Sequence, residues 1–121
     1  GDDYETQDGT CVRDYIHVED LASAHRLALE TIQDGTATAY NVGTGQGHSV
    51  KEVVQVAGRV TGREIPVEVG PRRPGDPPVL IADASQIREA LGWQPQWTSI
   101  EDTISSAWAW HESHPTGFQD R

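Results

Sequence analysis

The sequence has no methionine among its 121 residues and only one cysteine, Cys11. Because a chain without methionine cannot start at an initiation codon, we expect a fragment or a processed product. A single cysteine excludes a disulfide within the chain and is typical of a reducing compartment such as the cytoplasm. No apolar run approaches the roughly 18 residues of a membrane span, so the sequence predicts no transmembrane segment.

Basic residues are also scarce, since nine Lys and Arg stand against nineteen Asp and Glu, for a net charge of −10. Proteins that bind nucleic acid or an anionic membrane usually carry a basic patch, so we expect neither as a partner. An anionic ligand must therefore be held by a few arginines. Their planar guanidinium groups can bind two phosphate oxygens at once.

The residues that are present predict one α/β domain, residues 1–121. Apolar patterns predict short strands at 11–16, 39–42, 65–69 and 79–81. Helical spacing predicts about four helices, at 18–32, from 50 to the glycine at 62, at 84–91, and from about 98 to the proline at 115. Strands this short do not close a sheet, and parallel sheets need cover on both faces, so we expect a partner segment to be missing.

Capping residues define several helix ends. Ser49 and Glu52 form a capping-box pair, and Asp83 is expected to cap the third helix. Thr98 and Glu101 are expected to begin the last one. The inward face of the first helix is predicted from residues at helical spacing, which are Val18, Leu21, Ala22, His25, Leu29 and Ile32.

A glycine loop at 43–47 follows a predicted strand and precedes a helix, as in a dinucleotide-binding turn. However, His48 stands where the third glycine of that fingerprint would fall. Ser49 and Glu52 also satisfy the first amide groups of the helix, which a pyrophosphate would otherwise use. These features favour a simple glycine-rich turn over a nucleotide site.

The loop Arg72-Arg73-Pro74-Gly75-Asp76 is the first candidate site, because it combines two of the nine basic residues with a fixed φ and a flexible glycine. It could present guanidinium groups to a diphosphate and a carboxylate to a sugar hydroxyl. The alternative is a solvated charged turn. Arg13 is the second candidate, and it either binds the same phosphate or forms a salt bridge with Asp14 or Asp76.

Other reactive side chains predict no catalytic or metal site. His25 is expected to be packed in its helix, and His111 with His114 lacks the further ligands of a zinc site. The tryptophans are expected to pack in the core or on the surface. No tyrosine is followed four residues later by a lysine, so the catalytic pair of a short-chain reductase is absent.

Several motifs together resemble the UDP-glucose 4-epimerase family. They are DGTCVRDYIHV at 8–18, YNVGTG at 40–45, RRPGD at 72–76, ADAS at 82–85, LGW at 91–93 and WAWH at 108–111. They follow the order and spacing of the family, and the resemblance covers nearly the whole chain. It corresponds to the C-terminal third of an extended short-chain dehydrogenase/reductase.

The resemblance implies that the intact enzyme interconverts UDP-glucose and UDP-galactose by passing a hydride from the sugar to a tightly held NAD and back. In the family, the NAD-binding Rossmann half and the catalytic tyrosine and lysine lie upstream. The resemblance therefore implies that this chain is the C-terminal substrate-binding portion, with no NAD and no catalytic residue of its own. UDP-glucose and UDP-galactose are the expected ligands.

The resemblance also assigns site residues. Arg13 and Arg73 would hold the diphosphate, and the loop from Arg73 through Pro74 and Gly75 to Asp76 would wrap the uridine nucleotide. Leu80 stands beside the sugar, where many bacterial members carry tyrosine. This departure leaves the preference for N-acetylated sugars open.

Two alternatives remain at this stage. The chain could belong to a related nucleotide-sugar enzyme, such as a UDP-glucuronate epimerase or a nucleotide-sugar dehydratase, or it could be a non-enzymatic truncated chain that only self-associates. An unpaired strand around 40–42 would recruit other chains, so we expect a homo-oligomer.

Overall fold

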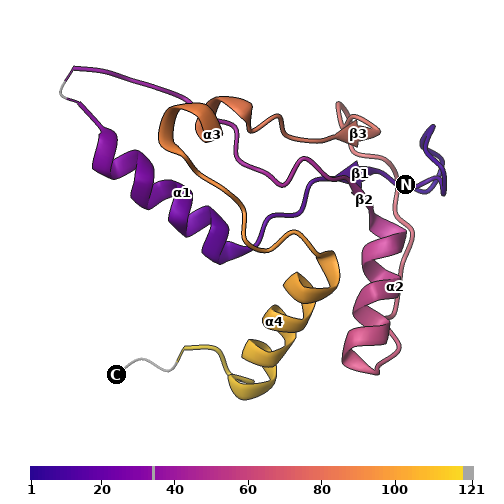
Figure 1. Cartoon of the computed structure of the whole chain (residues 1–121). Helices are drawn as coiled ribbons and strands as arrows, with labels where there is room; N and C mark the ends of the chain where they lie inside the picture. The colour runs from indigo at the N-terminus through magenta and orange to yellow at the C-terminus, as the bar shows by residue number, and fades with distance from the viewer. Residues whose placement is uncertain (34, 119–121) are drawn as a thin grey trace.

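The computed structural model describes residues 1–33 and 35–118, and its strands form a small mixed sheet (Figure 1). The strand order is β2-β1-β3, with β1 at Val12–Arg13, β2 at His48–Ser49 and β3 at Val79–Leu80. β2 is antiparallel to β1, β3 is parallel to it, and Arg13 lies opposite Leu80 in that register. The predicted α/β class is confirmed, and the strands expected at 11–16 and 79–81 are present but shorter.

Two predicted strands are wrong. Residues 39–42 pair with no strand in the described part of the chain, and their Tyr40 and Val42 pack against the buried core instead. Residues 65–69 are also irregular, because Pro66 has no amide hydrogen to donate and Val67 and Val69 are exposed. β2 was not expected, since its two polar residues give no apolar alternation.

The four helices found in residues 1–33 and 35–118 are α1 (Val18–Thr31), α2 (Val50–Thr61), α3 (Ser85–Leu91) and α4 (Ile100–Ser113). The capping pair of α2 is confirmed, because the Ser49 hydroxyl accepts a hydrogen bond from the Glu52 amide at 3.0 Å. Gly62, with φ of 65°, ends this helix in the left-handed region. Figure 1 shows α2 and α4 packed alongside each other.

The starts of α3 and α4 differ by one residue from the predicted positions. Asp83 accepts a hydrogen bond from the Ser85 amide at 2.9 Å, but Ala84 occupies the cap position of α3. Ser99, and not Thr98, caps α4 by accepting from the amide of Asp102. Ser99 is the cap because its hydroxyl reaches an amide three residues ahead, which is the geometry that a cap requires.

The core lies between α1 and α3 and is built around Trp93. Ala24, Ala84, Ile87 and Trp93 are buried together. The Trp93 indole N–H donates to the Asp20 carbonyl at 3.1 Å and to the Ser23 hydroxyl at 3.0 Å. The buried Asp20 carboxylate accepts from the amides of Gln96 and Trp97, which anchors the segment that leads into α4.

These contacts turn α1 the other way from the prediction. Asp20 and Ala24 face inward, whereas the expected apolar face is open, with Leu29 73% and Ile32 70% exposed. His25 is exposed and not packed, although its Nδ1 lies 2.8 Å from the Leu21 carbonyl oxygen. The polar anchor at Asp20 decides the orientation, because burying a carboxylate requires all its hydrogen bonds to be made.

None of the helices in the described ranges is long and apolar enough to cross a membrane. Within the same ranges, no three His, Cys, Asp or Glu side chains gather closely enough to hold a metal ion.

Candidate functional site

The site centres on Arg13, which β1 places in the middle of the sheet. One terminal nitrogen, Nη1, donates to the Val12 carbonyl at 2.7 Å, and the other, Nη2, forms an ion pair with Asp76. The two charged side chains are 21% and 27% exposed. Of the two salt bridges that the sequence left open for Arg13, the structure forms the one with Asp76.

Tyr4, in an N-terminal turn, contacts the Asp76 side of this ion pair. The Tyr4 ring is buried, and its hydroxyl donates to the second carboxylate oxygen of Asp76 at 3.4 Å. The Arg72 guanidinium lies over the Tyr4 ring, 4.4 Å from its centroid, and its Nε donates to Asp3 at 2.7 Å. Burial raises the pKa of the Tyr4 phenol, and the adjacent Asp76 carboxylate raises it further. Tyr4 therefore stays protonated and available as a donor.

The loop that carries Arg73 bends back onto itself. The Asp76 amide donates to the Arg73 carbonyl at 3.2 Å, and Gly75 has φ of 78°, a conformation that side-chain-bearing residues rarely adopt. Arg73 and Pro74 are exposed at the tip of this turn. The flexible glycine that the sequence singled out therefore makes the turn.

Arg13 and Arg73 line the same groove. This groove has a volume of about 610 Å³ and is bordered by Tyr4, Asp76, Val67, Val69 and the N-terminal turn. A second cavity, of about 340 Å³, is lined by Arg13 and Asp14, by Asn41 and Val42, and by residues 80–83, which begin with Leu80. Arg13 thus borders both spaces, with Arg73 on one side and Leu80 on the other.

Asp14 holds the walls of the second cavity together. Its carboxylate accepts hydrogen bonds from the Thr44 amide and hydroxyl, from the Gly45 amide at 2.9 Å, and from the Ala82 amide at 3.3 Å. Burial raises the pKa of the Asp14 carboxyl, but these hydrogen bonds outweigh it, and the pKa lies below its usual value. The glycine loop is therefore a structural turn whose amides bind a carboxylate of the same chain.

Gly43 makes this close approach possible. A Cβ atom at position 43 would lie 2.5 Å from the Asp14 carboxylate and 2.6 Å from the Ala82 Cβ. Arg88 approaches the same loop from α3, with its Nη2 3.4 Å from the Thr44 carbonyl oxygen. The loop is thus fixed by an acid on its amide side and by an arginine on its carbonyl side.

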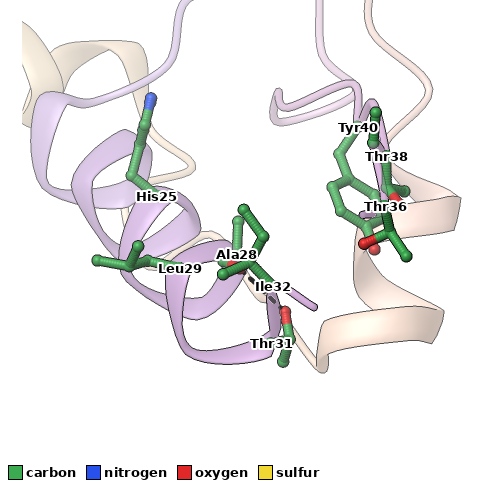
Figure 2. Close-up of a pocket in the computed structure, with 9 residues that line it drawn as sticks. His25, Ala28, Leu29, Thr31, Ile32, Thr36, Thr38 and Tyr40 are labelled. Atoms are coloured by element: carbon green, nitrogen blue, oxygen red, sulfur yellow. Dashed lines mark hydrogen bonds between the residues drawn. The ribbon is translucent and has the colours of Figure 1, made fainter. Parts of the chain in front are cut away.

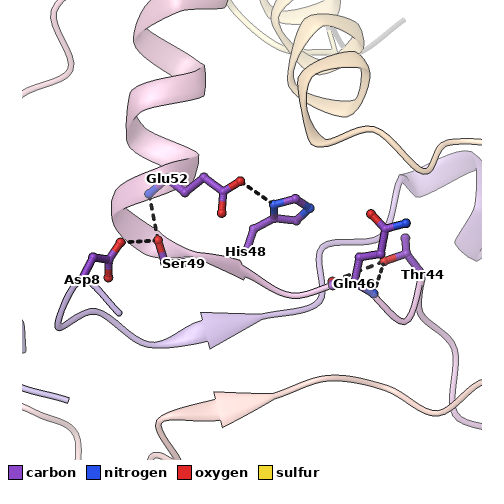
Figure 3. A network of polar contacts seen from close by, with 6 residues as sticks. All are labelled: Asp8, Thr44, Gln46, His48, Ser49 and Glu52. Carbon is purple, nitrogen blue, oxygen red and sulfur yellow. Dashed lines mark hydrogen bonds and ion pairs between the residues drawn. The ribbon is translucent and has the colours of Figure 1, made fainter. Parts of the chain in front are cut away.

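A polar network at the start of α2 fixes the N-terminal turn to the helix (Figure 3). The Ser49 hydroxyl donates to Asp8, and His48 Nδ1 lies 2.9 Å from Glu52. The Asp8 carboxylate also accepts from the Thr10 amide and hydroxyl, and its pKa is lowered, first by Ser49 and then by Thr10. Because Ser49 caps the helix, the first amides of α2 are already bonded and offer no anion site.

Another cavity lies away from Arg13 and Arg73 (Figure 2). It has a volume of about 620 Å³ and lies between the C-terminal part of α1 and residues 36–40. Figure 2 shows Leu29 of α1 and Ile32, which follows the helix, on one side and Thr38 and Tyr40 on the other. The lining is largely apolar, and its titratable side chains are His25 and Tyr40.

Two residues of the site were missed from the sequence. Tyr4 stands alone among acidic residues, and a lone aromatic in a polar turn is the signal that could have found it. Asp14 lies within the strand predicted at 11–16, and its partners are 30 and 68 positions away, so no local pattern identifies it. Arg13, Arg73 and Asp76, by contrast, lie together as one cluster around the groove.

Comparison with known proteins shows a consistent set of similarities. Residues 2–107 match the family described as GDP-mannose 4,6 dehydratase. A UDP-glucose 4-epimerase from Halalkalibacterium halodurans is 52% identical over 119 residues, which are 98% of this chain and 36% of the relative. One from Streptomyces lividans is 52% identical over 121 residues, again 36% of its length. The chain thus spans about a third of the length of these relatives.

Solved structures give the same result. A crystal structure of a UDP-glucose 4-epimerase matches with a TM-score of 0.87 and 50% identity, over 99% of this chain and 37% of the other. The enzyme from Bifidobacterium longum, solved in complex with NAD+ and UDP, matches with a TM-score of 0.87 and 45% identity. That match covers 98% of this chain and 35% of the other.

Proposed function

Because the chain belongs to the extended short-chain dehydrogenase/reductase family and is a homologue of UDP-glucose 4-epimerase, we propose that it supplies the diphosphate-binding part of a UDP-sugar site. One observation carries the proposal. Arg13 and Arg73, from distant parts of the chain, line one groove of a protein whose net charge is −10. The same groove also carries Asp2, Glu68 and Asp76, so the support for an anionic ligand is the pair of guanidinium groups and not a net positive charge of the groove.

The roles of the site residues follow from their positions. Arg13 and Arg73 bind the diphosphate oxygens through charge-assisted hydrogen bonds. Asp76 accepts from hydroxyls of the nucleotide, and the turn through Pro74 and Gly75 closes over it. Leu80 borders the second cavity on the far side of Arg13, so it faces the sugar and influences which sugar is accepted.

We assign no NAD contact to the described residues. The amides of Thr44 and Gly45 donate to Asp14, and Ser49 caps α2, so the glycine loop does not fit a cofactor pyrophosphate. As the family resemblance implies, we assign the hydride chemistry of NAD, and the catalytic tyrosine and lysine, to sequence of the whole enzyme outside this chain. The chain alone should therefore bind the nucleotide without epimerase turnover, even with NAD added.

Titration of the purified chain with UDP, followed by calorimetry, tests this function. We expect saturable binding that weakens on the order of 10- to 100-fold in Arg13→Ala and in Arg73→Ala, because each loses a charge-assisted hydrogen bond. The double variant should lose less than the sum, since both groups act on one ligand. Arg26→Ala is the matched control, because Arg26 pairs with Glu30 on the exposed surface of α1.

The match to the GDP-mannose 4,6 dehydratase family supports a second candidate, a site for a guanine nucleotide sugar. A parallel titration with GDP separates the two. Tighter binding of GDP than of UDP would favour the dehydratase, whereas equal binding by the Arg13→Ala protein and the unaltered chain would contradict both assignments.

A further inference from the structure

Arg13 and Asp76 form an ion pair within the chain itself. Both side chains are about three-quarters shielded from solvent, and the Tyr4 hydroxyl holds the other oxygen of Asp76. The pair is therefore screened less than a surface salt bridge. The positive charge that Arg13 presents to the groove is compensated by the Asp76 carboxylate of the same chain.

An anion that enters the groove must compete with that carboxylate. If the anion binds the Arg13 guanidinium in place of Asp76, the Asp76 carboxylate loses its counter-ion and lies beside the negative charge of the anion. Asp2 and Glu68 also line the groove and add to the repulsion. A plain polyanion such as pyrophosphate carries no sugar hydroxyls. The acidic P–OH proton that it keeps near neutral pH lies on the same negatively charged groups that would bind the guanidinium, so it cannot approach Asp76 without bringing further negative charge against the carboxylate.

A nucleoside diphosphate differs from pyrophosphate in carrying a neighbouring pair of hydroxyl donors on its ribose. Such hydroxyls can donate to the displaced carboxylate while the diphosphate takes the guanidinium. Both members of the broken ion pair are then satisfied by one ligand. A buried polar group left without a partner is costly, so this exchange separates ligands by whether they bring both functions.

We propose that Asp76 is a specificity-determining residue. Its ion pair with Arg13 disfavours the binding of simple polyanions, whereas a ligand that carries both a diphosphate and vicinal hydroxyls can replace both partners of the pair. The inference rests on the proposed function but goes beyond it, because it assigns to Asp76 a role against the wrong ligands. If the inference is right, a substitution of Asp76 should strengthen the binding of a simple polyanion and should not strengthen that of a nucleoside diphosphate.

Asp76→Asn tests this, with pyrophosphate and UDP as the probes and calorimetry as the measurement. Asparagine keeps the shape and can still accept from Tyr4, but it does not neutralise Arg13. Pyrophosphate binding should tighten about three- to tenfold, the scale of one partly shielded ion pair, whereas UDP binding should weaken or stay unchanged. Arg13→Ala in the Asp76→Asn background should remove the gain.

Asp2→Asn is the matched control, because it removes one negative charge from the same groove without touching Arg13. Equal tightening of pyrophosphate in Asp2→Asn would overturn the proposal, since the effect would then be one of overall charge. Unchanged pyrophosphate binding in Asp76→Asn, with UDP still bound through Arg13, would overturn this inference alone. Failure of both ligands to bind any of the proteins would overturn the proposed function with it.

Discussion

At the scale of single residues, the site is organised by two aspartates with different tasks. Asp76 neutralises Arg13 and faces the groove, whereas Asp14, the next residue after Arg13, faces the opposite cavity and accepts from three backbone amides. Arg13 lines both the groove and the second cavity, whereas Asp14, just after β1, lines only the second cavity of the two. One short strand thereby connects the ligand groove to the glycine loop.

Asp14 should make the stability of the chain depend on acid pH. The lowered pKa means that Asp14 binds protons less readily in the folded than in the unfolded chain, so its contribution is present above pH of about 4 and is lost as pH falls through the folded pKa. Asp14→Asn should cost about 2 kcal/mol at neutral pH, because three amides lose a charged acceptor. Urea unfolding at pH 7 and at pH 3 measures both effects.

The control for Asp14→Asn is Asp2→Asn, which changes the same charge at an exposed residue. We expect the Asp2 variant to follow the unaltered chain at both values of pH. If Asp14→Asn unfolds at the same urea concentration as the unaltered chain at neutral pH, Asp14 does not hold the loop as described.

At the scale of elements, all four predicted helices form, whereas only two of the four predicted strands do, and both are shorter than expected. Ser49 with Glu52, and the glycines at 62 and 92, mark helix ends locally, so α2 and α3 are found from neighbours in the sequence. Two-residue strands carry no such pattern, because β1 pairs with residues about 36 and 67 positions away. Apolar periodicity also misled at α1, where the buried polar residue Asp20 determines which face turns inward.

The site, too, divides into features that local sequence predicts and features that only long-range contacts define. The residue types and the clustering at 72–76 were visible, and the meeting of Arg13 with Asp76 was one of two alternatives. The support from Tyr4 and Asp14 depends on contacts across 72 and 68 positions, which only the folded chain defines.

Two glycines should respond in opposite ways to alanine. Gly43→Ala should destabilise the chain by about 1–3 kcal/mol, because the new Cβ would collide with Asp14 and Ala82. Gly58→Ala should stabilise it by about 0.5–1 kcal/mol, because Gly58 lies within α2 and the nearest atom to a Cβ is the Arg63 carbonyl oxygen, 3.4 Å away. Thermal unfolding of both variants measures the contrast, and shifts of the same sign would contradict it.

At the scale of the whole molecule, apolar surface is unevenly covered. The outer face of α1, with Val18 and Leu29, is open, and Leu29 continues with Ile32, just after the helix, into the cavity of Figure 2. This surface replaces the 40–42 segment as the reason to expect association, since that segment forms no strand edge. Exposed apolar area of this kind favours contact with another chain.

The chain should therefore self-associate, and Leu29→Gln with Ile32→Gln should shift it toward the monomer. The reason is that the two side chains are among the most exposed large apolar groups of the molecule. Light scattering across a concentration series measures the mass. Val67→Gln, at an exposed valine outside α1, is the control, and an equal shift in that variant would place the contact elsewhere.

The long-range contacts of the site also bear on the order of folding. Tyr4 bonds to Asp76, Arg72 to Asp3 and Asp20 to Trp97, across separations of 72, 69 and 77 positions. Closing such large loops is slow compared with forming a capped helix, so α1 and α2 can form while the groove does not yet exist. The segment 72–76 must reach the N-terminal part of the chain before Arg13 acquires its counter-ion, which makes ligand recognition one of the last properties that this sequence gains as it folds.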